Sequence, residues 1–392
     1  MAKIDDSVKK KVPELRFPGF TDDWEERKLK DIAQFNPKTV LPDEFEYVDL
    51  ESVVGTEMIS HRTESKDQAP SRAQRLAQKG DVFYQTVRPY QMNNYLYDLP
   101  YDNYVFSTGY AQMRPNIDSY FLLNSVQNKQ FVQHVLDRST GTSYPAINSS
   151  DLSKIEIHVP SKLSEQQKIG AFFQSIDDTI ALHQRKLDLL KEQKKGYLQK
   201  MFPKNGAKVP ELRFAGFADD WEQRKLGEIS EKVTLKNKDN TFDETLTNSA
   251  EFGIISQNDF FDKEISNRSN LNGYYVVENN NFVYNPRISN FAPVGPIKRN
   301  KLGRTGVMSP LYYVFKTRNI DNDFLEKYFD TTYWHIFMKL NGDSGARADR
   351  FAIKDSVFKE MPIPFPKIEE QIKIGNFFKQ LDDTIALHQR KS

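Results

Sequence analysis

The sequence predicts an α+β protein of two globular α/β domains, separated by long antiparallel coiled-coil helices and built by internal duplication with a pseudo-two-fold relation. Three observations predict this fold class. Two pairs of sequence blocks recur in the same order, which is the signature of a duplicated architecture. A long stretch in the first half has coiled-coil spacing, and the segments between the blocks mix strand-like and helix-like patterns.

The repeated blocks frame two unlike segments. VPELRFPGFTDDWEERKL at residues 12–29 matches residues 209–226 at 15 of 18 positions, and residues 165–186 match residues 370–391 at 17 of 22. The first pair is offset by 197 residues and the second by 205, so the inner segment is 8 residues longer in the second half. This order predicts two copies of one structural framework, formed by the repeated blocks and called the frame below. Each copy carries a different inner segment and therefore a different surface.

The inner segments share only short similar runs, such as Val82-Phe83-Tyr84 and Phe282-Val283-Tyr284. Short runs of β-branched and aromatic residues predict strands, and two longer stretches have helical spacing. The predicted strands include residues 81–87, 274–277 and 311–315, and the helical stretches are residues 121–136 and 324–340. Each inner segment is therefore expected to form a mixed globule of about 130 residues.

The repeated C-terminal block predicts a long helix. Ser164 can cap it with Gln167 three residues later, and Phe202-Pro203 marks its end. Apolar residues recur at steps of 4 and 3 if His183 and Lys194 fill two gaps, as in a coiled-coil seam. About 37 residues give a rod of about 55 Å. The seam and subunit-docking residues of this helix are Ile169, Phe173, Ile176, Ile180, Leu187 and Leu190. An ordinary core helix is the alternative interpretation.

The second copy carries the same seam at Ile374, Phe378, Leu381 and Ile385. Duplicated halves related by a two-fold axis would pair their helices antiparallel. The counterpart of residues 187–200 would follow Lys391, so the second helix is expected to be about 22 residues long. The predicted domains are residues 1–163, a long spacer helix at 164–202, residues 203–367, and a shortened spacer helix at 368–392.

Composition excludes several classes of protein. Lys plus Arg is 55 and Asp plus Glu is 54, so the net charge of +1 excludes a strongly basic coat. The absence of cysteine excludes disulfides, thiol nucleophiles and cysteine-ligated metals, and it is typical of a reducing, cytoplasmic location. We expect no secretory signal and no membrane span. Phosphate-binding loops, dinucleotide fingerprints and amino-methyltransferase motifs are also missing, so we expect no active site and no metal.

Loops of both inner segments gather Arg, Lys, Asn, Gln and Tyr. Arg, Asn and Gln can read base edges with paired hydrogen bonds, while Lys and Arg neutralise phosphates. For any single cluster a solvated loop is the favoured interpretation, and only the recurrence of such loops in two unlike segments favours DNA binding. The candidate DNA-binding residues are Arg88, Tyr90, Gln91, Asn93, Asn94, Thr142, Ser143 and Tyr144 in the first segment, and Arg287, Ser289, Asn290, Lys298, Arg299, Lys301, Arg304, Arg347 and Arg350 in the second.

The order of inner segment and EQ-x-K-I helix, present twice, resembles the specificity subunit of type I restriction–modification systems. The matching signatures begin at Glu165-Gln166 and Glu370-Gln371, and the PELRF blocks resemble those of Gram-positive, staphylococcal-like members. The resemblance implies that each globular domain is a target-recognition domain for one half of a split, asymmetric DNA site. It also implies that the helices set the spacer between the half-sites.

The resemblance further implies partners for a chain that catalyses nothing itself. Two modification subunits would bind S-adenosylmethionine and methylate adenine in double-stranded DNA. Motor–nuclease subunits would use ATP and Mg, as part of a defence against phage. Two alternatives stay open on the residues alone. One is a non-DNA scaffold with two adaptor domains on a coiled coil, and the other is a standalone enzyme, which the motif search disfavours.

Overall fold

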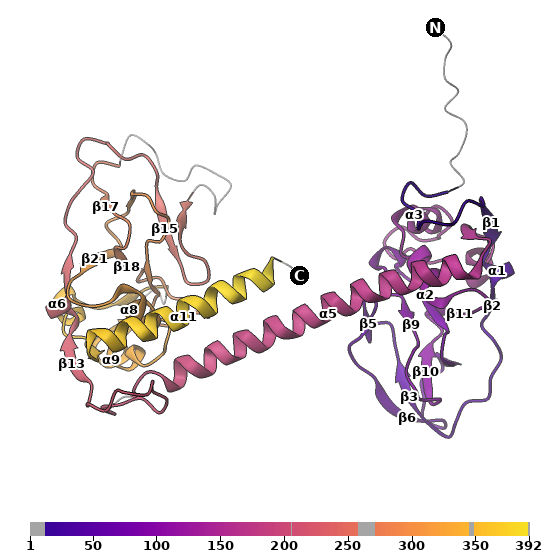
Figure 1. Cartoon of the computed structure of the whole chain (residues 1–392), viewed down its shortest axis with the longest axis horizontal. Coiled ribbons are helices and arrows are strands. Elements are labelled where there is room, and N and C mark those ends of the chain that lie inside the picture. Colours follow the sequence, from indigo (N-terminus) through magenta and orange to yellow (C-terminus); the bar gives the residue numbers. More distant parts are fainter. Residues whose placement is uncertain (1–11, 205, 258–270, 345–348, 391–392) are drawn as a thin grey trace, which may run out of the picture. The chain divides into compact units, whose positions relative to one another are not determined.

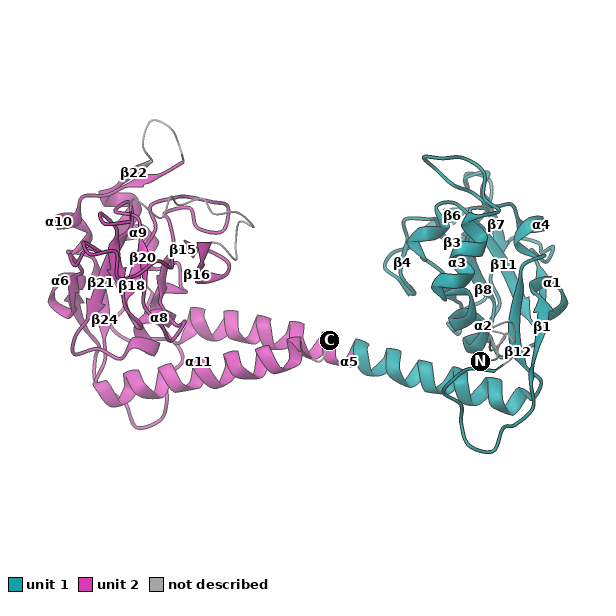
Figure 2. Cartoon of the chain, turned by 90° about the horizontal axis from the view of Figure 1, so that it is seen from above, with its two compact units in different colours: residues 1–181 teal, residues 182–392 magenta. Residues whose placement is uncertain are grey.

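A computed structural model of the protein describes residues 12–204, 206–257, 271–344 and 349–390. The chain divides into two compact units, the first unit (residues 1–181) and the second unit (residues 182–392), which Figure 2 colours separately. The boundary falls within helix α5 (Leu163–Lys200), so that the two units share this helix.

The first unit is a sheet-on-sheet arrangement with helices on its outer side. Its central sheet has the order β2-β11-β8-β9, and its second sheet has the order β6-β3-β10-β7. The elements are β1 (Trp24–Lys28), α1 (Leu29–Ile32), β2 (Ala33–Phe35), β3 (Glu44–Val48), β4 (Val53–Val54), β5 (Glu57–Met58), β6 (Arg62–Ser65), β7 (Ala73–Leu76), β8 (Val82–Gln85), a 3-10 helix (Pro89–Gln91), β9 (Tyr95–Leu96), β10 (Tyr104–Ser107), β11 (Tyr110–Pro115), α2 (Ser119–Val126), α3 (Lys129–Leu136), α4 (Ser149–Leu152) and β12 (Glu156–Pro160).

The second unit repeats the central sheet as β14-β21-β18-β19, with α11 beside the later part of α5 (Figure 1). The elements are β13 (Glu222–Lys225), α6 (Leu226–Ile229), β14 (Ser230–Lys232), β15 (Leu246–Ser249), β16 (Gly253–Ser256), β17 (Tyr275–Val277), β18 (Phe282–Tyr284), β19 (Ile297–Arg299), β20 (Gly306–Met308), β21 (Tyr313–Thr317), α8 (Asn322–Phe329), α9 (Trp334–Asn341), β22 (Asp343–Ser344), β23 (Phe351–Ala352), α10 (Asp355–Phe358), β24 (Pro362–Phe365) and α11 (Ile368–Gln389).

The two similar tripeptides, residues 82–84 and 282–284, lie in the corresponding inner strands of the two central sheets. In β8, Val82 and Tyr84 join the core under the helices, while Phe83 points into the core shared with the second sheet and stacks on Phe106 at 3.7 Å. Successive side chains of a strand point to opposite faces, so a strand covered on both sides is apolar throughout. Residues 282–284 of β18 divide in the same way between two cores. The predicted α+β duplication is confirmed.

A buried ion pair fastens each repeated N-terminal block to the start of its helix. Arg16 donates two hydrogen bonds to the carboxylate of Glu165, at 2.6 and 2.8 Å. Arg213 does the same to Glu370, at 2.7 and 2.8 Å. Both glutamates are 1% exposed. A paired arginine and carboxylate in this geometry fix orientation as well as charge, which explains why the two blocks recur together.

The glutamine and glycine of the repeated signature hold the helix against the entry of α2. Gln166 donates to the carbonyl of Pro160 at 2.8 Å and accepts from the backbone N–H of Asp118 at 3.2 Å. Asp118 caps α2, and a Cβ at Gly170 would lie 2.3 Å from its Oδ1 atom, so only glycine fits there. The second unit repeats these contacts with Gln371, Pro366, Asp321 and Gly375.

In the second unit, α11 runs antiparallel to the later part of α5. Tyr197 packs on Phe377 at a ring distance of 5.0 Å, whereas the earlier His183 lies by the later His388, with Nδ1 atoms 3.4 Å apart. Residue numbers therefore rise along one helix as they fall along the other. This arrangement confirms the antiparallel pairing, and α11 has the predicted 22 residues.

Two local predictions are wrong. Helix α5 begins at Leu163, which places Ser164 inside the first turn and not at the cap. The stretches 121–136 and 324–340 are each two helices, because the chain breaks between α2 and α3 and between α8 and α9. The side chain of Asn128 caps α3 by accepting from the N–H of Gln130, which starts a new helix where the apolar spacing would have continued.

Candidate nucleic-acid interface

The structure brings the two candidate loops of the first unit together. The loop after β8 runs antiparallel to the loop after α3, since Val87 bridges Ala146 and the N–H of Arg88 donates to the carbonyl of Pro145 at 2.8 Å. The guanidinium of Arg88 lies 4.6 Å from the ring centre of Tyr144. Residues 88–94 and 140–146, far apart in sequence, therefore form one surface.

Arg88 has a left-handed backbone, with φ at 54° and ψ at 56°. Left-handed geometry costs a residue with a Cβ roughly 1–2 kcal/mol, so neighbouring contacts must hold it there. The surface formed by the two loops exposes two aromatic rings, Tyr90 at 50% and Tyr144 at 64%. Together they offer one cation and two flat rings, a combination suited to stacking and polar contacts with nucleic acid.

The other candidates of the first unit differ in accessibility. Thr142 and Ser143 are exposed. Gln91 accepts a hydrogen bond from Gln85, and Asn93 accepts one from the backbone N–H of Gly55. Asn94 is only 1% exposed and accepts from the N–H of Gln85, which corrects the expectation that it presents a free polar side chain.

The second unit pairs its corresponding loops in the same way. The backbone N–H of Ile288 donates to the backbone carbonyl of Asp349 at 3.2 Å, and Arg287 and Arg350 form an antiparallel β-bridge through their backbones. The two arginines therefore lie on neighbouring segments of the loop pair. Ser289 and Ala292 close a tight turn by mutual backbone hydrogen bonds. Its exposed tip holds Asn290 and also Phe291, which is 80% exposed.

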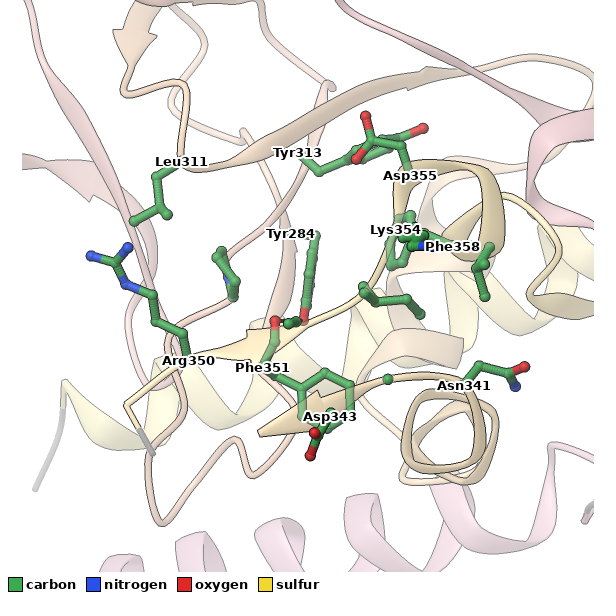
Figure 3. A pocket seen from close by; sticks show the side chains of 15 residues that line it. Tyr284, Leu311, Tyr313, Asn341, Asp343, Arg350, Phe351, Lys354, Asp355 and Phe358 are labelled. Atoms are coloured by element: carbon green, nitrogen blue, oxygen red, sulfur yellow. Dashed lines mark hydrogen bonds between the residues drawn. The ribbon is translucent and has the colours of Figure 1, made fainter. Parts of the chain in front are cut away.

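Sequence reasoning missed Phe291, although a large aromatic residue inside an Asn- and Ser-containing turn is itself a signal. Arg347 lies outside the described residues. Arg350 is at one side of an open cavity of about 780 Å³, with Asp355 on the opposite side and Tyr284 between them (Figure 3). Burial raises the pKa of Tyr313 in the same wall to about 12, so that its hydroxyl stays protonated at neutral pH.

The basic cluster of residues 298–304 lies elsewhere in the second unit. Its cations pair with carboxylates: Lys298 with Asp330 at 2.9 Å, Arg299 with Asp323 and with Glu326 at 2.6 Å, Lys301 with Glu326 at 3.2 Å, and Arg304 with Glu244 at 2.7 Å. Arg299 lies in β19 and is 9% exposed, which corrects its placement in a surface loop. A phosphate would have to displace these acids.

The seam residues also divide into two groups. In the first unit, Phe173, Ile176 and Ile180 are 39%, 38% and 47% exposed, whereas Ile169 packs against the core. In the second unit the seam is covered: Leu187, Ile374 and Phe378 are buried, and Leu190, Leu381 and Ile385 are half-buried. The seam side chains are thus largely exposed to solvent in the first unit and largely buried in the second.

Two further properties bear on the class of site. Across the described part of the chain, no group of three or more His, Cys, Asp or Glu side chains is placed to hold a metal ion. Among the same residues, no helix is long and apolar enough to cross a membrane. The features that stand out are paired polar loops, one pair on each copy of a repeated frame.

Two unlike loop faces on duplicated frames, each joined to a long helix, define a two-domain recognition protein. The profile of the type I restriction modification DNA specificity domain matches residues 21–192 and 218–392. The chain belongs to this family and carries two copies of its domain.

Curated relatives carry specificity-subunit names. The HindI specificity subunit of Haemophilus influenzae is 26% identical over 41% of this chain and 37% of its own length. The putative MjaX specificity subunit of Methanocaldococcus jannaschii is 25% identical over 71% of this chain and 65% of its own length. The chain therefore spans about two thirds or less of these relatives.

Solved structures share the fold. A type I restriction–modification S subunit from M. genitalium aligns with a TM-score of 0.56 at 14% identity, covering 97% of this chain and 94% of that one. A chain from a study of assembly and conformational transition of the type I R-M system aligns with a TM-score of 0.53 at 21% identity, with coverage of 97% and 94%. These identities support the architecture alone.

Proposed function

We propose that this chain is the DNA sequence-recognition subunit of a type I restriction–modification complex. The observation that carries the proposal is the duplicated frame with two different loop pairs, at Arg88–Tyr144 and at Arg287–Arg350. Two unlike faces predict a split and asymmetric site, with each half read by one target-recognition domain. The domains at residues 1–163 and 203–367 are joined by spacer helices at 164–202 and 368–392, which set the gap.

The proposed complex supplies the chemistry that this chain lacks. Two modification subunits would bind S-adenosylmethionine and methylate adenine, and motor–nuclease subunits would use ATP and Mg. This chain binds double-stranded DNA and catalyses no step itself. Its net charge of +1 supports weak DNA affinity in isolation, because affinity for the phosphate backbone grows with the number of cations that contact it.

The repeated PELRF blocks support a Gram-positive, staphylococcal-like type within the family. The lack of cysteine supports a cytoplasmic location, where thiols stay reduced. The DNA-contacting residues are proposed to lie in the paired loops, with the half-buried Arg88 and the exposed Tyr144, Arg287 and Arg350 foremost.

Genome-wide methylation mapping tests the proposal directly. Cells would carry the full chain with its modification subunit, and control cells would carry the modification subunit alone. The expected result is a new split motif with methylated adenine in both strands. The absence of any motif from a complex that assembles stably, together with no preference among randomised DNA sequences, would favour the scaffold alternative.

A further inference from the structure

Helices α5 and α11 bring two copies of one repeat position into contact. His183 and His388 occupy the same place in the two repeated blocks, 205 residues apart in sequence. In the second unit, where α11 runs beside the later part of α5 (Figure 2), their Nδ1 atoms lie 3.4 Å apart. Elsewhere along the pair different repeat positions meet, as Tyr197 meets Phe377. Histidine therefore faces its own copy at this point of the seam.

The two imidazole rings face each other through the same nitrogen. Their ring centres lie 5.5 Å apart at an interplanar angle of 45°, whereas the Nδ1 atoms of His183 and His388 are 3.4 Å apart. Each Nδ1 atom is thus on the side of its ring that faces the other ring. A neutral imidazole carries its proton on one nitrogen and a lone pair on the other. The pair can therefore form one N–H···N hydrogen bond or offer two lone pairs to a shared metal ion.

The separation of the two nitrogens fits the shared metal ion better. The donor and acceptor atoms of an N–H hydrogen bond usually lie about 2.7–3.2 Å apart, so 3.4 Å is long for such a bond. Two nitrogens bound to one tetrahedral Zn²⁺ ion at about 2.0–2.1 Å lie about 3.4 Å from each other. Imidazole suits Zn²⁺, Ni²⁺ and Cu²⁺, whereas Mg²⁺ and Ca²⁺ prefer oxygen. The donor atoms therefore favour a transition-metal ion.

Other contacts hold the two histidines in place without a metal ion. Farther along the same pair of helices, Leu187 is 4% exposed and Lys194 forms an ion pair with Asp382 at 2.7 Å. Ligands that are already positioned lose little conformational freedom when they bind. His388 is 8% exposed, but His183 is only half-buried, so water can reach the pair. An ion bound there can complete its coordination with water molecules.

We propose that His183 and His388 form a two-histidine site for a divalent transition-metal ion such as Zn²⁺, and that the bound ion fastens α11 to α5. Two protein ligands are fewer than the three or four of most zinc sites, so water molecules fill the remaining positions. No sequence motif marks the site, because its ligands belong to different repeats and meet only when the two helices pair. The proposal concerns the helix pair and does not depend on DNA recognition.

Isothermal titration calorimetry of the full chain with ZnCl₂ tests the proposal, after treatment with EDTA and without a polyhistidine tag. One tightly bound ion per chain is expected. His183→Gln and His388→Gln should each weaken Zn²⁺ binding by about tenfold or more, because each variant keeps only one imidazole ligand. His134→Gln is the matched control, since His134 is an exposed histidine of α3 in the first unit. This control should bind Zn²⁺ as the parent chain does.

Hydrogen exchange measured by mass spectrometry shows whether the ion fastens the two helices. Zn²⁺ should slow amide exchange in residues 380–389 of the parent chain and leave strand β8 unaffected. EDTA should reverse the effect, and this comparison requires no variant to fold. The same concentration of MgCl₂ should have no effect, because Mg²⁺ prefers oxygen ligands.

Three results would overturn the proposal. The first is the absence of a tightly bound ion. The second is binding that survives both histidine substitutions in chains that circular dichroism shows to be folded. The third is binding that leaves exchange in α11 unchanged, which would identify an adventitious ion only. The measurements contain no DNA, so their outcome is separate from that of the methylation maps.

Discussion

Single residues of the repeated signature have separate structural tasks. Glu165 neutralises Arg16, Gln166 satisfies two backbone groups, and Gly170 lets α5 approach the cap of α2. Since these tasks require both the N-terminal block and the helix, neither block can change alone. The repeated signature therefore connects the N-terminal block to the helix, and any DNA sequence specificity must come from other residues.

Gly170→Ala should destabilise the protein by about 1–3 kcal/mol, because the new methyl group would overlap Oδ1 of Asp118. Gly196→Ala is the matched control in the same helix. A Cβ at Gly196 meets nothing within 4 Å, so this variant should gain up to about 1 kcal/mol from better helix propensity. Chemical unfolding of both variants measures the difference. Equal stability of the two would contradict the close approach at Gly170.

Arg88→Ala should weaken recognition of one half-site by about 1–3 kcal/mol if the guanidinium contacts a base. Removal of the cation should not affect the half-site read by the second unit. Binding of the assembled complex to DNA with each half-site altered in turn gives the measurement. A uniform loss on all DNA sequences would reassign Arg88 to a phosphate contact, and Lys129→Ala on exposed α3 serves as the control.

At the scale of elements, the sequence predicted the long helix and the strand β8, since periodicity is a local property. It predicted the antiparallel pairing from the two-fold relation expected of duplicated halves. It could not predict which seam residues are covered. Phe173 and Phe378 lie in nearly identical sequences, yet one is 39% exposed and the other is buried, because only Phe378 has Phe202 beside it. Likewise, the sequence around Arg299 predicts an exposed loop cation. In the structure Arg299 lies in β19 and forms ion pairs with Asp323 and Glu326.

Helix α9 should make the stability of the second unit depend on pH. Burial, with a smaller effect of Lys339, lowers the pKa of His335 to about 4. Between pH 6.5 and 4 the unfolded chain binds the proton and the folded chain does not, so the free energy of unfolding falls as pH falls. His335→Gln should remove up to about 3 kcal/mol of this pH dependence. Urea unfolding followed by tryptophan fluorescence at several pH values measures it, and an unchanged slope would show that His335 titrates normally.

At the scale of the whole molecule, the duplication was evident from the sequence because copied blocks need no structural knowledge to detect. The paired loops were predicted only as separate clusters. Their meeting depends on β8 and β18 being inner strands of their sheets, which directs the following loop toward the loop after α3 or α9. The order of strands within a sheet cannot be predicted from local residue spacing, so the sequence did not indicate that these loops meet.

The proposed role of α5 as a ruler gives a prediction at this scale. A duplicate of residues 175–181 inserted after Ala181 adds about 10 Å of helix and precedes the pairing with α11 that starts at His183. The preferred spacer should change while both half-sites stay the same, as read from methylation maps. The same seven residues inserted after Asp67, in an exposed turn, should leave the spacer unaltered. An unchanged spacer in the helix variant would contradict the ruler.

Strand pairing at the base of each unit has an evolutionary consequence. Lys28 of β1 lies opposite Glu156 of β12, and Lys225 of β13 lies opposite Pro362 of β24. Paired strands hold such residues about 5 Å apart, so each inner segment begins and ends at nearly the same point of the repeated framework. An inner segment with such closely spaced ends could be replaced as a whole by recombination, and the repeated blocks would keep their contacts. With two such positions on one chain, independent exchange of the segments would let a small number of segments generate a much larger number of paired loop faces.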